Sequence, residues 1–448
     1  RAETGSFKSD VRPVRLNEVL EQGLRQSHDE QIRQYKSEFY DLQWDDNHRK
    51  FWLPHVKLTM TTEEKRLSRI HRGSKQGYAY SEPASGELGL EFGEYTLFNW
   101  GKDYLKYLNQ QTDYLRNKQS LYEKKRNLKQ ELIIRYFELV NSHDIEDVLR
   151  QQLRHTSFIY RLNRERLAIG KAPKQEYLQA RSEYLRAQNE FYQARTNTQL
   201  LEEKMSYYLS DPVGTRYILR DKLKYQQLNT QVDEVVKISR QSNGEILDSV
   251  RQVETTNRDY EVTLKENLPL PKISVNLGAY THSFNRNNNQ TSYETHPGDS
   301  NIDVVASINA SWSIFGEGGL FNASQRAMAV VNRNMALEGL NRSKDLATNN
   351  VREYFRTVHH LQNQMSIMEA KVEVARKAFD VIMDNYINRK SSFVTFKDAL
   401  NDRTQSEIQF ALTKLEHLRN KVLMAQAMGV ENPPGEILER LVIEEKVK

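Results

Sequence analysis

Residues 302–314 read IDVVASINASWSI, with apolar and polar side chains alternating at a period of two. This pattern is typical of a β-strand with one apolar face, and about ten such residues are enough to cross a bilayer when the strand is tilted. We therefore expect a membrane strand over about 301–314, with lipid-facing residues at Ile302, Val304, Ile308 and Trp312.

The surroundings of this strand occur twice in the chain, 217 residues apart. The segment TLFNWG at 96–101 matches SIFGEG at 313–318, and LPHVKL at 53–58 matches LPKISV at 270–275. Two motifs in the same order at the same offset indicate an internal duplication.

The offset drifts by only two residues along the rest of the repeat. IIRYFELV at 133–140 matches VREYFRTV at 351–358, which is an offset of 218. Met205 matches Met424 at an offset of 219. We therefore expect repeats at 1–210 and 231–429, separated by a segment at 211–230 and followed by one at 430–448.

Each repeat is expected to contain a helix, two strands, a long helix and a return helix. The first helices are expected at about 16–50 and 232–266. The strands are expected at about 54–64, 86–98, 271–284 and 301–314, with polar loops at 63–85 and 285–300. The long helices are expected at about 101–165 and 319–386, and the return helices at 175–209 and 394–428. Helices of this length require coiled-coil-like packing. The segments at 211–230 and 430–448 are expected to fold against the outside of a helical tunnel.

The composition excludes several classes of protein. Apolar residues make up 38 %, charged residues 28 %, and the mean hydropathy is −0.78, which favours thin, solvent-flanked helices over a thick core. Because 65 basic residues are interleaved with 60 acidic ones, no free basic stripe indicates nucleic-acid binding. Because the sequence contains no cysteine, we expect no disulfides, no thiolate metal sites and no N-terminal cysteine lipid anchor.

The membrane signal comes from the strands. No apolar run approaches 18 residues, so no membrane-spanning helix is expected, but hydropathy windows miss short alternating strands. The chain begins at Arg1 without a preceding apolar stretch, which is what removal of a leader would leave. Four strands cannot close a barrel, and open edges are too costly in hydrocarbon, so we expect three chains to form one twelve-stranded barrel.

With this order of elements, the chain resembles the TolC family of outer-membrane efflux proteins over nearly its whole length. The family's strand-to-helix turn resembles residues 98–101 and 315–319. Its helical-tip pattern resembles Arg166 to Gly170, followed by Glu176, Leu178 and Ala180.

The resemblance implies a trimeric β-barrel of twelve strands, four from each chain, continued by a long α-helical barrel. It implies a passive exit duct in the Gram-negative outer membrane, with the tunnel in the periplasm, serving a tripartite efflux or type I secretion system. The implied partners are a periplasmic adaptor, an inner-membrane transporter and outer-membrane lipid. It implies neither an enzyme nor a cofactor.

The resemblance also implies a gate and docking sites at the inner helical tips. The gate residues would be Asp398, Thr395, Arg389, Tyr386 and Glu176. The adaptor would dock at Gly170, Lys171, Arg389 and Lys390. The second tip departs from the family, because Arg389 stands where glycine is usual and Thr395 replaces the first of two acids. Asp398 on a solvated helix face, without a gate role, remains the alternative.

Other readings are weaker. A structural coiled-coil scaffold without a pore would have no need of four lipid-length strands. The glycine-rich stretch at 315–319 lacks the Lys-Ser/Thr of a phosphate loop. Adjacent His359 and His360 point about 100° apart on a helix, which is poor geometry for one metal. No catalytic constellation appears. The aromatic residues near the strands fit an interface belt or ordinary sheet packing.

Overall fold

The computed structural model describes residues 11–62, 68–70, 77–79, 86–284, 302–315 and 321–444. Most of the two expected polar loops, at 63–85 and 285–300, therefore lies outside the described residues, as do Arg1 and residues 316–320 of the second turn motif. Within the first loop the described part is a short antiparallel pair that we did not expect, β3 (Ser68–Ile70) with β4 (Gly77–Ala79).

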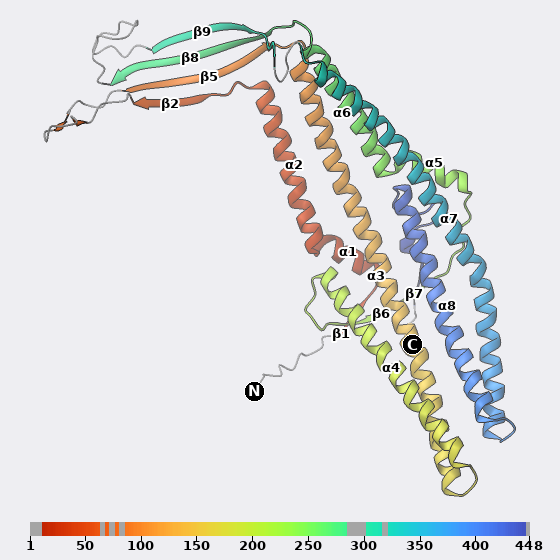
Figure 1. Ribbon diagram of the computed structural model, residues 1–448. Helices are drawn as coiled ribbons and strands as arrows, with labels where there is room; N and C mark the ends of the chain where they lie inside the picture. The colour runs from red at the N-terminus through yellow and green to blue at the C-terminus, as the bar shows by residue number, and fades with distance from the viewer. Residues whose placement is uncertain are drawn as a thin grey trace. The chain divides into compact units, whose positions relative to one another are not determined.

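One order of helices and strands occurs twice (Figure 1). The first series is α1 (Leu16–Gln26), α2 (His28–Trp52), β2 (Lys57–Thr62), β5 (Gly86–Phe98), α3 (Lys102–Ala168) and α4 (Lys174–Leu209). The second series is α5 (Val232–Ser242), α6 (Gly244–Glu266), β8 (Lys272–Phe284), β9 (Ile302–Ser311), α7 (Ala323–Ile387) and α8 (Phe393–Met428). The boundaries of the two repeats as units of the chain, 1–210 and 231–429, stay a prediction.

The first helix of each series differs from the prediction, because each is two helices. Ser27 separates α1 from α2, and Asn243 separates α5 from α6, both with extended backbone. Ser27 Oγ accepts a hydrogen bond from the Glu30 N–H, and Asn243 Oδ1 accepts one from the Ile246 N–H. Each break is therefore stabilised by an N-cap of the following helix. The Ser-x-x-Glu sequence that begins at Ser27 is typical of a helix N-terminus and could have predicted the first break.

Two strand predictions are too long. β2 begins at Lys57 instead of residue 54, and β9 ends at Ser311, before Trp312. Residues before β2 follow Pro54, which cannot donate a ladder hydrogen bond. Among the helices of the described residues, none is long and apolar enough to cross a membrane.

The chain forms two compact units. The first comprises Arg1–Glu38, Lys118–Ser249 and Leu340–Lys448, and the second comprises Phe39–Asn117 and Val250–Gly339. Each unit contains parts of both series.

The second unit contains a four-stranded antiparallel sheet in the order β2-β5-β8-β9 (Figure 1). In the pairing of β8 with β9, apolar residues lie opposite apolar ones, such as Val275 opposite Ile308. Polar residues lie opposite polar ones, such as Ser274 opposite Asn309. The alternation in the sequence thus continues across neighbouring strands, as a sheet with two chemically different faces requires.

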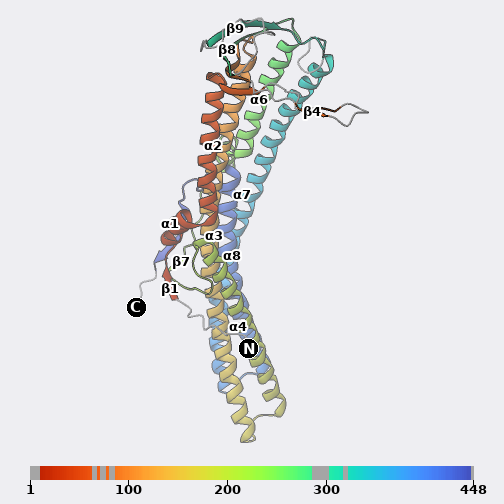
Figure 2. The ribbon, with the colours of Figure 1, turned by 90° about the vertical axis from the view of Figure 1, so that its left-hand side faces the viewer.

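The first unit has a core where the helices meet short strands. β1 (Val11–Val14) pairs in parallel with β6 (Arg216–Leu219), and β10 (Val442–Glu444) pairs antiparallel with β7 (Asp221–Leu223). Their apolar residues pack with those of α1, α3, α4 and α8, and Tyr136 and Phe137 of α3 are fully buried there. In Figure 2, β1 and β7 lie beside α1 and α3. β1 was not predicted, because four residues give too little periodicity.

A buried ion pair attaches the C-terminal segment to α8. Lys421 Nζ lies 2.8 Å from Glu436 Oε2 and also donates to the Gln226 carbonyl oxygen. Both side chains are almost completely excluded from solvent. Burial lowers the pKa of Lys421, while Glu436 opposes that shift by stabilising the charged ammonium.

Breaking this pair should be costly because it leaves one buried charge uncompensated. Glu436→Leu should lower the free energy of unfolding by about 3–5 kcal/mol. The double variant Lys421→Met/Glu436→Leu should recover most of that loss, since both charges are then gone. Denaturant unfolding of the three proteins would measure this, and a double variant as unstable as Glu436→Leu would contradict it.

Candidate functional site

The ends of the two long helical hairpins are built alike. α3 turns into α4 at Gly170, and α7 turns into α8 at Arg389. The Lys171 N–H donates to the Arg166 carbonyl at 2.7 Å, and the Lys390 N–H donates to the Asn385 carbonyl at 2.7 Å. This is the Schellman arrangement, which requires a left-handed residue after the helix.

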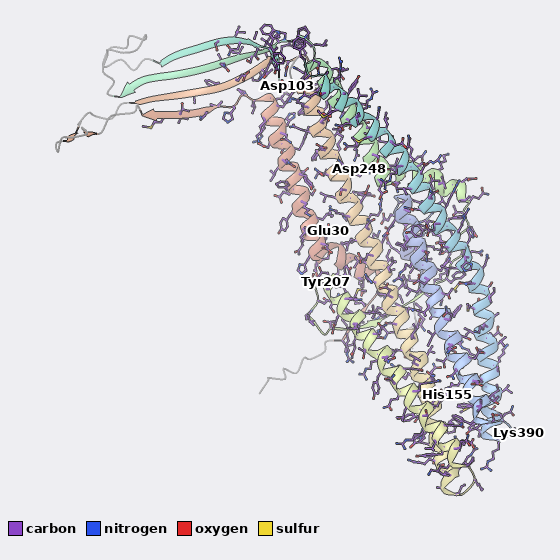
Figure 3. The ribbon with its side chains drawn as sticks, viewed as in Figure 1. Glu30, Asp103, His155, Tyr207, Asp248 and Lys390 are labelled. Atoms are coloured by element: carbon purple, nitrogen blue, oxygen red, sulfur yellow. The ribbon has the colours of Figure 1, made fainter. Side chains whose placement is uncertain are left out.

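Arg389 adopts that left-handed conformation in place of glycine. Its φ is 63°, and the φ of Gly170 is 68°. A side chain in this region costs roughly 1–2 kcal/mol in the steric contact between Cβ and the next carbonyl oxygen. Arginine in place of the family's usual glycine therefore leaves the turn geometry unchanged. It adds backbone strain and a positively charged side chain. Lys390 lies at the same turn (Figure 3).

Tyr386 connects the two hairpins. It comes from the last turn of α7, and its side chain is 2 % exposed. Its Oη donates to Glu176 Oε1 of α4 at 2.6 Å and accepts from Asn163 Nδ2 of α3 at 2.7 Å. Burial raises the pKa of Tyr386, and the hydrogen bond to Glu176 raises it further, so the hydroxyl stays a donor.

Arg166 adds a second link between the same hairpins. Its Nη2 donates to the Ile387 carbonyl at 2.7 Å, and its guanidinium lies 5.8 Å from the centre of the Tyr386 ring. The bond satisfies one of the carbonyl groups that the end of α7 leaves unpaired. We define Asn163, Arg166, Glu176 and Tyr386 as the tip network.

An apolar cluster supports the tip network. Phe379, Phe393, Phe396 and Leu400 are buried around Tyr386, together with Ile159 and Ala180. The ring of Tyr386 stacks on Phe396 with centroids 5.3 Å apart. The tyrosine is therefore held by packing on its ring and by hydrogen bonds at its hydroxyl, which fixes both hairpins.

The structure does not bring every predicted gate residue into this network. Tyr386 and Glu176 are in direct contact, but Thr395 and Asp398 are exposed on the first turns of α8. The backbone N–H of Thr395 donates to Ser392 Oγ, so this residue belongs to the N-cap of α8. Among the described residues, no ion pair within 4 Å involves Arg389 or Asp398.

Asp398 does lie near another acid. Glu183 of α4 is buried, and burial is the main cause of its raised pKa. Lys397 lowers the pKa of Glu183 by charge, and Asp398 raises it. Glu183 is itself paired with Arg186, whose Nη2 also donates to Asn401 Oδ1 at 2.5 Å. A second acid near Asp398 is therefore present on α4, and it was not predicted from the sequence.

Asn163 and Arg186 were also not predicted from the sequence as residues of the site. Asn163 sits among charged residues in the sequence RLNRER and gives no signal of burial, yet it is fully buried. The predicted docking residues Gly170, Lys171 and Lys390 lie in the exposed turns. No cluster of His, Cys, Asp and Glu suited to a metal occurs among the described residues.

The lipid-facing prediction concerns a different part of the chain. Ile308 and Trp312 are exposed, and their polar neighbours Asn309 and Ser313 are exposed as well. The side chains of Ile302 and Val304 lie outside those that the structure describes. Which face contacts lipid therefore remains a prediction.

Comparison with known proteins concerns both the helical hairpins and the strands. A family model described as "Outer membrane efflux protein" matches residues 46–207. No curated protein sequence matches the chain.

The fold is similar to that of several solved structures. A membrane protein from Pseudomonas aeruginosa is 16% identical, with a TM-score of 0.74 over 96% of this chain and 94% of that one. The outer membrane protein VceC from Vibrio cholerae is 14% identical, with a TM-score of 0.71 over 93% of this chain and 96% of that one. The CmeC outer membrane channel from Campylobacter jejuni is 15% identical, with a TM-score of 0.71 over 94% and 87%.

The tip network should stabilise the ends of the hairpins. Tyr386→Phe leaves the buried Asn163 amide and the Glu176 carboxylate without their partner, which should cost about 1–3 kcal/mol. Hydrogen exchange of the last turn of α7 and the first turn of α4 should become faster. Tyr184→Phe, which alters a ring stacked on Tyr160 outside the network, is the matched control. Unchanged exchange in Tyr386→Phe would show that the network does not hold the tips.

The resemblance found in the sequence is thus confirmed: the chain carries the outer membrane efflux protein signature over residues 46–207 and has the fold of TolC-type outer-membrane channels.

Proposed function

We propose that three copies of this chain form a passive exit duct through the Gram-negative outer membrane. An inner-membrane transporter and a periplasmic adaptor would supply energy and cargo, in a tripartite efflux or type I secretion system. The match to the efflux family over 46–207 carries this proposal. The chain itself would perform no chemistry.

The sheet supports assembly from several copies. In the described residues β2 and β9 are the outer strands, and each pairs on one side only. A sheet in hydrocarbon has no water to satisfy its edge N–H and C=O groups, so a free edge is prohibitively costly. Three four-stranded sheets give a twelve-stranded barrel, intermediate between filled eight-stranded and open sixteen-stranded barrels.

The tip network supports a coupling between the two hairpins at the inner end. It ties α3 and α4 to α7 in one chain through Tyr386, with the hydroxyl bonded on both sides. Opening would require these hydrogen bonds to break or exchange, and we propose a second packing of the hairpins that a partner can favour. The adaptor would bias them by docking at the turns around Gly170, Lys171, Arg389 and Lys390.

Asp398 is proposed to line the narrow end. Threefold symmetry would bring three copies of this exposed carboxylate, and the nearby Glu183, around one opening, where they would attract cations. Among the described residues of one chain, neither Arg389 nor Asp398 forms an ion pair. A latch between the two residues would therefore have to join neighbouring copies.

The duct itself can be tested directly. The protein in detergent should be a trimer by native mass spectrometry, and it should conduct ions in a planar bilayer. Asp398→Ala should raise single-channel conductance and reduce any cation preference, because it removes three charges from the opening. Arg389→Gly should also raise conductance by removing the proposed latch.

Asp402→Ala is the control for the gate, since Asp402 is an acid one turn further along α8 that pairs with Lys371 at 3.7 Å. Conductance and selectivity unchanged in Asp398→Ala and Arg389→Gly would remove the gate assignment but leave the channel. A monomer without conductance would refute the duct and favour a coiled-coil scaffold.

The assignment of the lipid-facing side of β9 leads to a separate prediction. Ile308→Arg should cost about 2–4 kcal/mol near mid-membrane and impair insertion, whereas Asn309→Arg should be tolerated on the lumen face. The two residues are adjacent in β9 and lie opposite Val275 and Ser274 of β8. The yield of folded, heat-modifiable protein in outer membranes would measure the difference, and equal tolerance would mean that the faces are wrongly assigned.

A further inference from the structure

A buried histidine lies where two peripheral segments of the first unit attach to α8. The segments are residues 220–231, which include β7, and residues 430–444, which include β10. They are joined to each other by the pairing of β7 with β10 and by the bond from the Lys224 N–H to the Leu441 carbonyl at 2.9 Å. We call the two segments together the peripheral layer. The histidine is His417 of α8, and it is 3% exposed.

His417 and Lys421, one helical turn apart on α8, both contact the peripheral layer. The Tyr225 ring lies against the His417 ring, with centroids 5.1 Å apart. Lys421 Nζ donates to the Gln226 carbonyl oxygen at 2.5 Å, and to the two carboxylate oxygens of Glu436 at 2.9 and 2.8 Å. The same stretch of α8 therefore holds both segments of the layer.

The surroundings of His417 suit a neutral imidazole. Among the described residues, its buried Nε2 has no hydrogen-bond partner. A charged imidazolium donates from both ring nitrogens, so protonation would leave an N–H group unpaired in the interior. The Glu436 carboxylate is already bonded to Lys421 through both oxygens.

The charges around His417 act in the same direction. Burial is the main cause of its lowered pKa, and the charges of Lys421 and of His359 on α7 lower it further, to about 3 from an ordinary 6.5. Burial raises the pKa of Tyr225, and the charges of Glu369 on α7 and of Glu436 raise it further, so this hydroxyl stays neutral in acid.

We propose that His417 makes the attachment of the peripheral layer to α8 sensitive to acid. A neutral imidazole packs against Tyr225, and the layer stays in place. When the layer separates, the imidazole reaches water and takes up a proton. That proton opposes the return of the layer, because a second positive charge would then be buried one turn from Lys421. The inference goes beyond the proposed duct, and all of its residues belong to the first unit.

The direction of the pH dependence follows from which state binds more protons. In the separated layer His417 has the ordinary histidine pKa, and in the attached layer its pKa is lowered. The attachment is therefore strongest above about pH 6.5 and weakens as the pH falls below that value. Each pH unit between about 6 and 4 should raise the ratio of separated to attached molecules roughly tenfold.

Backbone hydrogen exchange of the intact protein in detergent can measure this ratio. Peptides from 221–228 and 436–444 would be followed by mass spectrometry between about pH 7 and pH 5, with correction for the chemical exchange rate at each pH. We expect their opening to increase roughly tenfold from about pH 6 to pH 5. Peptides from the hairpin end at 380–396 should not change, because the layer does not contact them.

Variants at His417 separate its role from that of other groups. His417→Phe keeps a ring against Tyr225 and cannot take up a proton, so the pH dependence should disappear. His417→Gln should remove it as well, and this variant serves if phenylalanine does not pack. His359→Gln should retain the pH dependence. His360→Gln is the matched control, because His360 is an exposed histidine on α7, and this variant should behave like the wild type.

Three results would overturn the proposal. The first is opening of the layer that does not change with pH in the wild type, and the second is a pH dependence that both His417 variants retain. The third is an increase that begins only below about pH 5, since carboxylates ordinarily take up protons near pH 4 and the Lys421–Glu436 pair would then be its source. An equal increase in the hairpin-end peptides would show unfolding of the whole unit and would also overturn it.

Discussion

The hydrogen-bonding requirement of strand edges is the constraint on which the rest of this chain depends. Among the described residues, β5 and β8 are paired on both sides, whereas β2 and β9 are paired on one side only. In water those edges could be solvated, but in hydrocarbon they must be paired. A chain with this sheet therefore cannot act alone in a membrane. In the proposed trimer, closure of the barrel would bring the long helices of the three copies around one axis.

The duplication places one junction between the two series inside a single chain. The β5–β8 pairing joins the first series to the second within one chain. In the proposed trimer, the remaining junctions would join the second series of one copy to the first series of the next.

The sequence predicted the order and most boundaries of the helices and strands, because long periodic segments carry a strong signal. It missed the breaks at Ser27 and Asn243, which the N-cap residues of the following helices mark. It could not place Asn163, because a polar residue buried by another hairpin has no local signature. It identified Tyr386 and Glu176 only through the family, and it could not show that Thr395 serves as part of a helix cap.

The tip network shows where the two repeats have diverged. If Gly170 and Arg389 are aligned, Glu176 corresponds to Thr395 and Tyr386 to Leu167. The carboxylate that receives the Tyr386 hydroxyl therefore exists only in the first repeat, and the tyrosine only in the second. Two copies of the first hairpin would lack the tyrosine hydroxyl, and two copies of the second would lack the carboxylate. Divergence of the repeats thus gave the tips a complementary pair, which links two hairpins alongside the bond from Arg166 to the Ile387 carbonyl.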